Sequence, residues 1–206
     1  MSTTTAQNCD FSPMKQLIKE DLRQLAESMG ELLQMLDNED YCQLGEFEKI
    51  KKNFMNIESR AATFYLNCYL SPHTDRYMDL SVCIQSLSEH RHGGLIAVER
   101  KDPLDNLIQP GIAIGAPVTH SLLESIFYPG NPLHDGAVLI RGNEIVSARN
   151  ILPLTGGHNP EQKTGTRHRA ALGLTERSDA IVLVVSEETG KASFSRLGRL
   201  YPVITP

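Results

Sequence analysis

The chain of 206 residues lacks several features that would each indicate a particular class of protein. Tryptophan is absent, and the cysteines Cys9, Cys42, Cys68 and Cys83 form neither a C-x-x-C pair nor a zinc-binding pattern with histidine. Unpaired thiols in a chain of this size are typical of a reducing compartment. We therefore expect a cytoplasmic protein that has no structural zinc site.

Long apolar runs and an excess of basic residues are also missing. The first residues, MSTTTAQNCDFSP, do not have the basic start and apolar stretch of a signal peptide. The longest apolar runs, such as residues 180–185, are far shorter than the roughly 20 residues needed to cross a bilayer. The net charge is −5, whereas proteins that coat DNA are usually basic. The sequence therefore predicts neither a membrane nor a nucleic acid as a partner.

The composition that remains is typical of a folded globular protein, with 40% apolar and 22% charged residues. In the first third, apolar residues recur every three or four positions from Phe11 to Leu36, after a helix start at Ser12-Pro13. Asp37-Asn38-Glu39-Asp40 interrupts the pattern. A second stretch carries a short heptad seam formed by Phe47, Ile50, Phe54, Ile57, Ala61, Phe64 and Cys68.

We interpret residues 1–70 as an N-terminal α-helical hairpin, separated by the polar segment 71–75 from a second domain over residues 71–206. In that domain, strands are predicted at 95–99, 112–114, 137–140, 145–147 and 180–185. Helices are predicted at 80–87, 119–127 and 166–177, and Gly93-Gly94 is expected to cap the first of them. The Gly142-Asn143 pair predicts a tight hairpin turn. The fold class is therefore α/β, with a mixed central β-sheet flanked by helices.

Three polar clusters in this domain could carry chemistry. The first, Gly165-Thr166-Arg167-His168-Arg169, lies at a predicted helix start, where unpaired N–H groups and the helix dipole attract phosphate. The positive end of the helix dipole repels basic side chains unless an anion is bound between them. Arginine can bind phosphate oxygens through two hydrogen bonds. The alternative is a solvated first turn whose basic residues pair with Glu176 or Asp179.

The other two clusters are less specific. Leu133-His134-Asp135-Gly136-Ala137 places a carboxylate and a glycine at the start of a strand, where they could contact a ligand or a divalent cation, but Asp-Gly is also a common turn. Ser186-Glu187-Glu188-Thr189-Gly190 follows the most apolar strand and reads equally well as a turn with solvated acids. The phosphate-binding P-loop, the dinucleotide-binding G-x-G-x-x-G and the hydrolase G-x-S-x-G patterns are all absent.

Taken together and in this order, the three clusters resemble the diadenylate cyclase domain, as do residues 94–99 and Leu152-Pro153-Leu154. The resemblance extends over roughly residues 77–195. It implies an enzyme that condenses two ATP molecules into cyclic di-AMP and two pyrophosphates, each 3′-hydroxyl attacking the α-phosphate of the other ATP across a face-to-face dimer. The helices ahead of the domain resemble those of the soluble, sporulation-associated type, in which they restrain activity and influence assembly.

The resemblance also assigns roles to residues. Asp135 would help to activate the nucleophile, and Arg167, His168 and Arg169 would complete the catalytic set. The nucleotide would contact Gly136, Ala137, Leu152, Thr166, Ser186 and Glu187. Mg²⁺ or Mn²⁺ would be held by Asp135, His134 and Glu188.

Because two half-sites must meet, the resemblance implies a homo-oligomer in which a dimer is needed for catalysis and for which a hexamer is one candidate assembly. Two other classes of function remain as alternatives: a catalytically silent nucleotide-binding regulatory module, and a scaffold assembled through the heptad seam.

Overall fold

The structure, a computed structural model, describes residues 12–36, 42–156 and 165–203. The chain divides into two compact units, Met1–Tyr65 and Leu66–Pro206, so the division lies five residues before the expected boundary at residue 70. The expected helix break at residues 37–40 falls outside the described residues.

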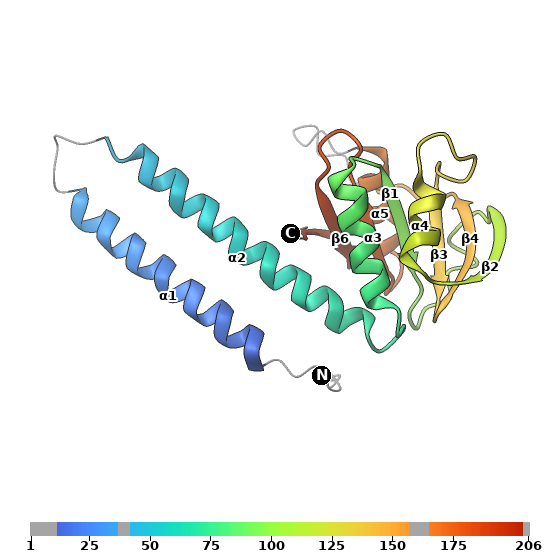
Figure 1. The fold of residues 1–206 in the computed structure, drawn as a ribbon, viewed down its shortest axis with the longest axis horizontal. Helices are drawn as coiled ribbons and strands as arrows, with labels where there is room; N and C mark the ends of the chain where they lie inside the picture. Colours follow the sequence, from blue (N-terminus) through green and yellow to red (C-terminus); the bar gives the residue numbers. More distant parts are fainter. Residues whose placement is uncertain (1–11, 37–41, 157–164, 204–206) are drawn as a thin grey trace. The chain divides into compact units, whose positions relative to one another are not determined.

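The first unit contains the helix α1 (Ser12–Met35) and most of α2 (Leu44–Leu70), which run antiparallel as predicted (Figure 1). Leu25 and Leu32 of α1 and Ile57 of α2 are buried, and Arg60 forms an ion pair with Asp21. The heptad seam of α2 is only partly covered, because Phe47 and Phe54 are about half exposed.

The second unit is built on a seven-stranded sheet with the order β2-β4-β3-β1-β5-β6-β7. The strands are β1 (Gly94–Val98), β2 (Ile112–Pro117), β3 (Ala137–Arg141), β4 (Glu144–Asn150), β5 (Ile181–Val185), β6 (Ala192–Arg196) and β7 (Arg199–Pro202). Only the β1–β3 pair is parallel. The sheet is therefore mixed, as the sequence predicted.

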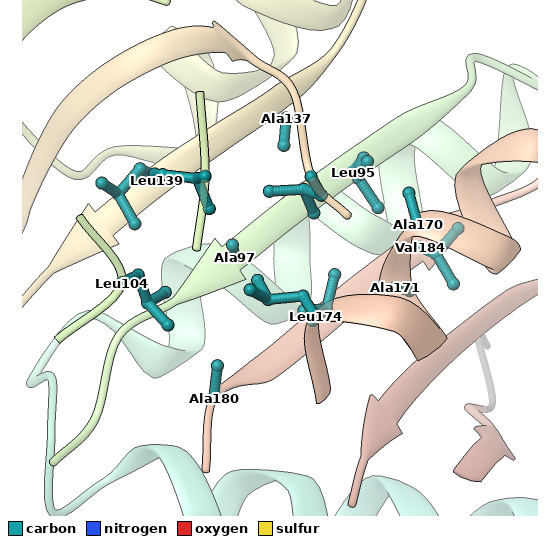
Figure 2. Close-up of a cluster of buried hydrophobic side chains, with 13 residues drawn as sticks. Leu95, Ala97, Leu104, Ala137, Leu139, Ala170, Ala171, Leu174, Ala180 and Val184 are labelled. Carbon is teal, nitrogen blue, oxygen red and sulfur yellow. The ribbon is translucent and has the colours of Figure 1, made fainter. Parts of the chain in front are cut away.

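Helices cover both faces of this sheet. The helix α3 (Tyr77–Glu89) contacts β5, β6 and the helix α4 (His120–Phe127), whereas α5 (Thr166–Thr175) contacts β1, β5, β6 and β7 (Figure 1). Successive residues of a strand point to opposite faces, so Leu95 and Ala97 of β1 face α5 while Gly94 faces Leu87 of α3. Figure 2 shows the first of these faces, where side chains of β1, β3 and β5 pack against Ala170, Ala171 and Leu174.

Several local predictions are confirmed. Thr119 caps α4 by accepting a hydrogen bond from the Leu122 N–H, and β3 and β4 are joined by Gly142-Asn143 with Arg141 paired to Glu144. The predicted glycine cap of α3 is wrong. The left-handed residue that ends this helix is Arg91 (φ 54°), and the N–H groups of Arg91 and His92 bond to the Ser88 and Leu87 carbonyls in a Schellman motif. The sequence reading also missed β6 and β7.

Candidate active site

Strand register brings the three polar clusters to one edge of the sheet. Gly94 of β1 pairs with Val185 of β5 in the antiparallel ladder, and Ile96 pairs with Val138 of β3 in the parallel one. The starts of β1 and β3 and the end of β5 therefore lie at the same edge. Asp135-Gly136 and Ser186-Glu187 adjoin these strand ends directly.

The first turn of α5 meets the end of β5 at this edge. Gly165 is the N-cap, and because glycine has no side chain it cannot itself cap the first N–H groups of the helix. The Arg167 guanidinium donates to a Glu187 carboxylate oxygen at 2.9 Å. Among the described residues, no ion pair joins this turn to Glu176 or Asp179. Glu176 accepts from Thr155 instead, and Asp179 accepts from the backbone of Lys101 and Asp102.

These two segments line a cleft of about 950 Å³. Its lining includes the polar residues Thr166, Arg167, His168, Ser186, Glu187, Glu188, Thr189, Lys191 and Ser193. The volume lies within the usual range for small-molecule sites, and the concentration of hydroxyls, cations and helix N–H groups suits an anionic ligand.

Burial acts on one member of the cleft. Burial lowers the pKa of the His168 imidazole below the usual 6.5, because desolvation disfavours the charged ring. A neutral ring can either donate or accept a hydrogen bond, so His168 could contact a ligand without adding a charge.

Gly93 leaves room for the guanidinium of Arg167. A Cβ atom at Gly93 would lie 2.3 Å from one guanidinium nitrogen of Arg167 and 2.5 Å from its central carbon. The guanidinium therefore occupies the space that any larger residue would fill, directly ahead of β1.

The Asp135-Gly136-Ala137 segment lies beside the end of β4. Asp135 is exposed, Ala137 is fully buried, and Gly136 has φ 114°, a conformation that favours glycine. A Cβ atom at Gly136 would approach the Arg149 backbone to 2.9 Å. The glycine therefore permits a close backbone contact that leaves the neighbouring carboxylate facing solvent.

Comparison with known proteins identifies the family of the chain. Residues 81–200 match the family model described as DisA bacterial checkpoint controller nucleotide-binding, and residues 5–73 match the model described as Diadenylate cyclase CdaS, N-terminal. The chain belongs to the diadenylate cyclase family. The second match also agrees with the predicted type, in which helices precede the cyclase domain.

Relatives cover most of the chain. It is 54% identical over 168 residues to diadenylate cyclase CdaS of Bacillus thuringiensis (strain BMB171), covering 82% of this chain and 84% of that protein. It is 48% identical to cyclic di-AMP synthase CdaS of Bacillus subtilis (strain 168), covering 90% and 89% of the two chains.

Two solved structures are also similar. A crystal structure of a hypothetical membrane spanning protein from Bacillus cereus aligns with TM-score 0.81 and 48% identity, covering 92% of this chain and 93% of that one. A double mutant of DacA from Staphylococcus aureus aligns with TM-score 0.59 and 40% identity, covering 62% and 85%. In the part of this chain that the structure describes, no helix is long and apolar enough to cross a membrane.

The cleft and its surroundings include residues that the sequence analysis missed. Ser193 of β6 and Leu200 of β7 line the cleft. Gly93 lies against the Arg167 guanidinium, and Arg149 lies against Gly136. The strict alternation in Ala192-Ser193-Phe194-Ser195 is a strand signal that could have revealed Ser193. Leu152, expected to contact adenine, is only 5% exposed and packs in the buried apolar cluster with Ala170 and Ala171 of α5.

The side chains that could bind a metal ion are spread out rather than clustered. Among the residues that the structure describes, no three His, Cys, Asp or Glu side chains gather as a metal site within one chain would require. Mg²⁺ commonly uses only one or two carboxylates together with substrate phosphates. Asp135 and Glu188 are both exposed, which fits that mode.

His134 could also bind a metal ion in this way. Its Nδ1 lies 2.6 Å from the Asn131 carbonyl oxygen, which makes Nδ1 the protonated nitrogen and leaves the Nε2 lone pair available.

Proposed function

We propose that the chain joins two ATP molecules into cyclic di-AMP with release of two pyrophosphates. The single observation that carries the proposal is the gathering of Asp135-Gly136-Ala137, Thr166–Arg169 and Ser186–Glu188 at one sheet edge. Residues of the last two segments line a cleft of about 950 Å³, and the Asp135 segment does not. The family of the chain supports the same reaction.

The triphosphate would lie along the first turn of α5. Thr166 and the backbone N–H groups of this turn would donate to phosphate oxygens, and Arg167 and Arg169 would neutralise their charge. Ser186 and Glu187 form the opposite wall, and Glu187 keeps Arg167 oriented through their 2.9 Å hydrogen bond. Positioning and charge neutralisation of this kind supply most of the rate in phosphoryl transfer.

Asp135 would accept the proton of the 3′-hydroxyl. The oxygen then attacks the α-phosphorus of the second ATP, the bond from that phosphorus to the bridging oxygen breaks, and pyrophosphate leaves. Repeating this step with the roles exchanged closes the ring. Gly136 and Ala137 present backbone to the nucleotide, and Leu152 supports the adenine side from within the core.

Mg²⁺ or Mn²⁺, when bound, neutralises phosphate charge and lowers the pKa of the attacking hydroxyl. Asp135 and the Nε2 lone pair of His134 would hold it together with phosphate oxygens of ATP, whereas Glu188, the third predicted ligand, does not gather with these two within one chain.

The reaction requires two sites that face each other. One ATP supplies the nucleophile and the other the electrophile, so a single chain holding one ATP cannot close the ring. We therefore propose a symmetric homo-oligomer, with a two-fold face-to-face dimer as its active unit.

The test is incubation of the full-length protein with ATP and Mn²⁺ or Mg²⁺, with products resolved by chromatography and mass detection. Cyclic di-AMP is expected, and Asp135→Asn should lower its rate by about 10²-fold or more. Asp105→Asn is the matched control, because this exposed carboxylate lies in the loop after β1, near the opposite sheet edge, and bonds to Arg141. ATP binding without any product from the wild-type protein would instead support the silent regulatory module.

A further inference from the structure

We infer that Asn150 is a positioning residue for the reaction, holding the Asp135-Gly136-Ala137 segment in place from the neighbouring strand. The inference rests on the proposed function, because it concerns the geometry of the Asp135 carboxylate. Asn150 is the last residue of β4, and its side chain is completely buried at the edge of the sheet where the site lies.

The Asn150 amide is fully hydrogen-bonded. Its Nδ2 donates to the Ala137 carbonyl at 2.8 Å and to the Ser147 carbonyl at 3.2 Å. Its Oδ1 accepts from the Ser147 hydroxyl at 2.8 Å and from the Gly111 N–H at 3.0 Å. A backbone N–H can only donate, so Oδ1 must face Gly111 and the donating nitrogen must face Ala137.

An irregularity in the β3–β4 ladder explains why a side chain is needed here. Ala137 pairs with Asn150 and Leu139 pairs with Ser147, so two steps along β3 match three along β4. This is a β-bulge. Arg149, which lies within it, adopts the left-handed conformation with φ 60°. Bulges redirect strands beside active sites, and a left-handed non-glycine residue persists only where its surroundings hold it.

The bulge is packed directly against the catalytic segment. A Cβ atom at Gly136 would lie 2.9 Å from the Arg149 backbone and 3.0 Å from the Asn150 carbonyl oxygen. The segment is thus held twice, by backbone contact at Gly136 and by the Asn150 hydrogen bond at Ala137. Asp135 precedes both points, so the orientation of its carboxylate depends on them.

The experiment compares Asn150→Ala with Ser147→Ala in the full-length protein. The first removes the bond to the Ala137 carbonyl. The second removes one buried hydrogen bond from the same network but leaves that carbonyl bonded. Both variants are checked by circular dichroism and thermal unfolding, and assayed well below the lower melting temperature.

For Asn150→Ala we expect kcat to fall about 10- to 100-fold, because small displacements of a catalytic group cost that much. The KM and the Kd for ATP should stay within about twofold, because the α5 phosphate contacts are untouched. Ser147→Ala should keep kcat within about twofold. Should Asn150→Ala not fold, Asn150→Ser is measured in the same way.

Three outcomes would overturn the inference: unchanged kcat in Asn150→Ala, a rise in KM with unchanged kcat, or equal loss of kcat in both variants in proportion to stability. Failure of the proposed function looks different, because the wild-type protein would then form no cyclic di-AMP. Wild-type turnover that is lost in Asp135→Asn keeps the proposed function standing, whatever Asn150→Ala does.

Discussion

Tyr69, in the last turn of α2, packs edge-to-face on Phe194 of β6, with ring centroids 6.4 Å apart. Phe194 stacks in turn on Tyr201 of β7, and the Arg196 guanidinium lies 4.4 Å from the centre of the Tyr69 ring. Leu70, beside Tyr69, is completely buried. The end of α2 is therefore part of the cyclase core, although the same helix begins in the hairpin.

This packing predicts how the chain can be shortened. Removing residues 1–65 should leave a stable domain, whereas removing residues 1–70 also deletes Leu66, Tyr69 and Leu70. The longer deletion should lower the free energy of unfolding by at least about 4 kcal/mol relative to the shorter one, because each large buried side chain contributes about 2–5 kcal/mol. Urea unfolding of the two proteins measures the difference. Equal midpoints would show that these contacts contribute little.

The shorter deletion also tests the restraint that the family resemblance implies. If the helical hairpin holds cyclase domains in a nonproductive arrangement, removal of residues 1–65 should raise the specific activity with ATP. The comparison is made at equal protein concentration, with the oligomer size of each protein followed by light scattering. An unchanged or lower rate in a folded truncation would count against the restraint.

Gly93→Ala should impair ATP turnover more than it impairs stability. The new methyl group would displace the Arg167 guanidinium, which is the flexible end of a side chain, so the fold can accommodate it. We expect kcat/KM to fall about 10-fold or more, because a bidentate phosphate contact is lost. Gly94→Ala is the matched control. Its methyl group would meet Leu87 on the other face of the sheet, and its effect should appear in the melting temperature instead.

The lowered pKa of His168 predicts a loss of stability in mild acid. Burial disfavours the charged ring, so between the folded-state pKa and about 6.5 the unfolded chain binds a proton that the folded protein does not. Stability should therefore fall as the pH drops from about 6.5 toward the folded-state pKa, and then level off.

His168→Gln should flatten this part of the curve of unfolding free energy against pH. His73, whose pKa is also lowered by burial, is expected to account for the remainder, so His73→Gln is measured alongside. A curve that keeps its full slope in His168→Gln would refute the assignment to this residue.

Local signals in the sequence were sufficient for much of the fold. The three- and four-residue spacing predicted α1 and α2, and the continuous apolar run predicted β5. Thr119 and the Gly142-Asn143 pair marked their cap and turn correctly, since each acts through its immediate neighbours. The site clusters were also readable, because helix-start cations and an Asp-Gly step have chemical meaning without any tertiary context.

Arg91 shows where local reasoning fails. A glycine is the usual left-handed residue at a helix end, and two glycines follow α3, yet the chain turns at Arg91 instead. Gly93 and Gly94 serve packing, one against Arg167 and the other against Leu87. Only contacts between distant segments distinguish these two uses of glycine.

By itself, then, the sequence determined the elements, the mixed sheet and the residues with chemical potential, because periodicity, caps and turns act over a few residues. The tertiary structure decided which of those residues meet. Register between β1, β3 and β5 places Asp135 and Glu187 at one sheet edge, where Arg167 of α5 bonds to Glu187. A bulge in β4 brings the Asn150 side chain to the Ala137 carbonyl. The aromatic contacts of Tyr69 place the end of α2 in the cyclase core. Pairing over long sequence separations depends on the packing of the whole domain, which no short pattern contains.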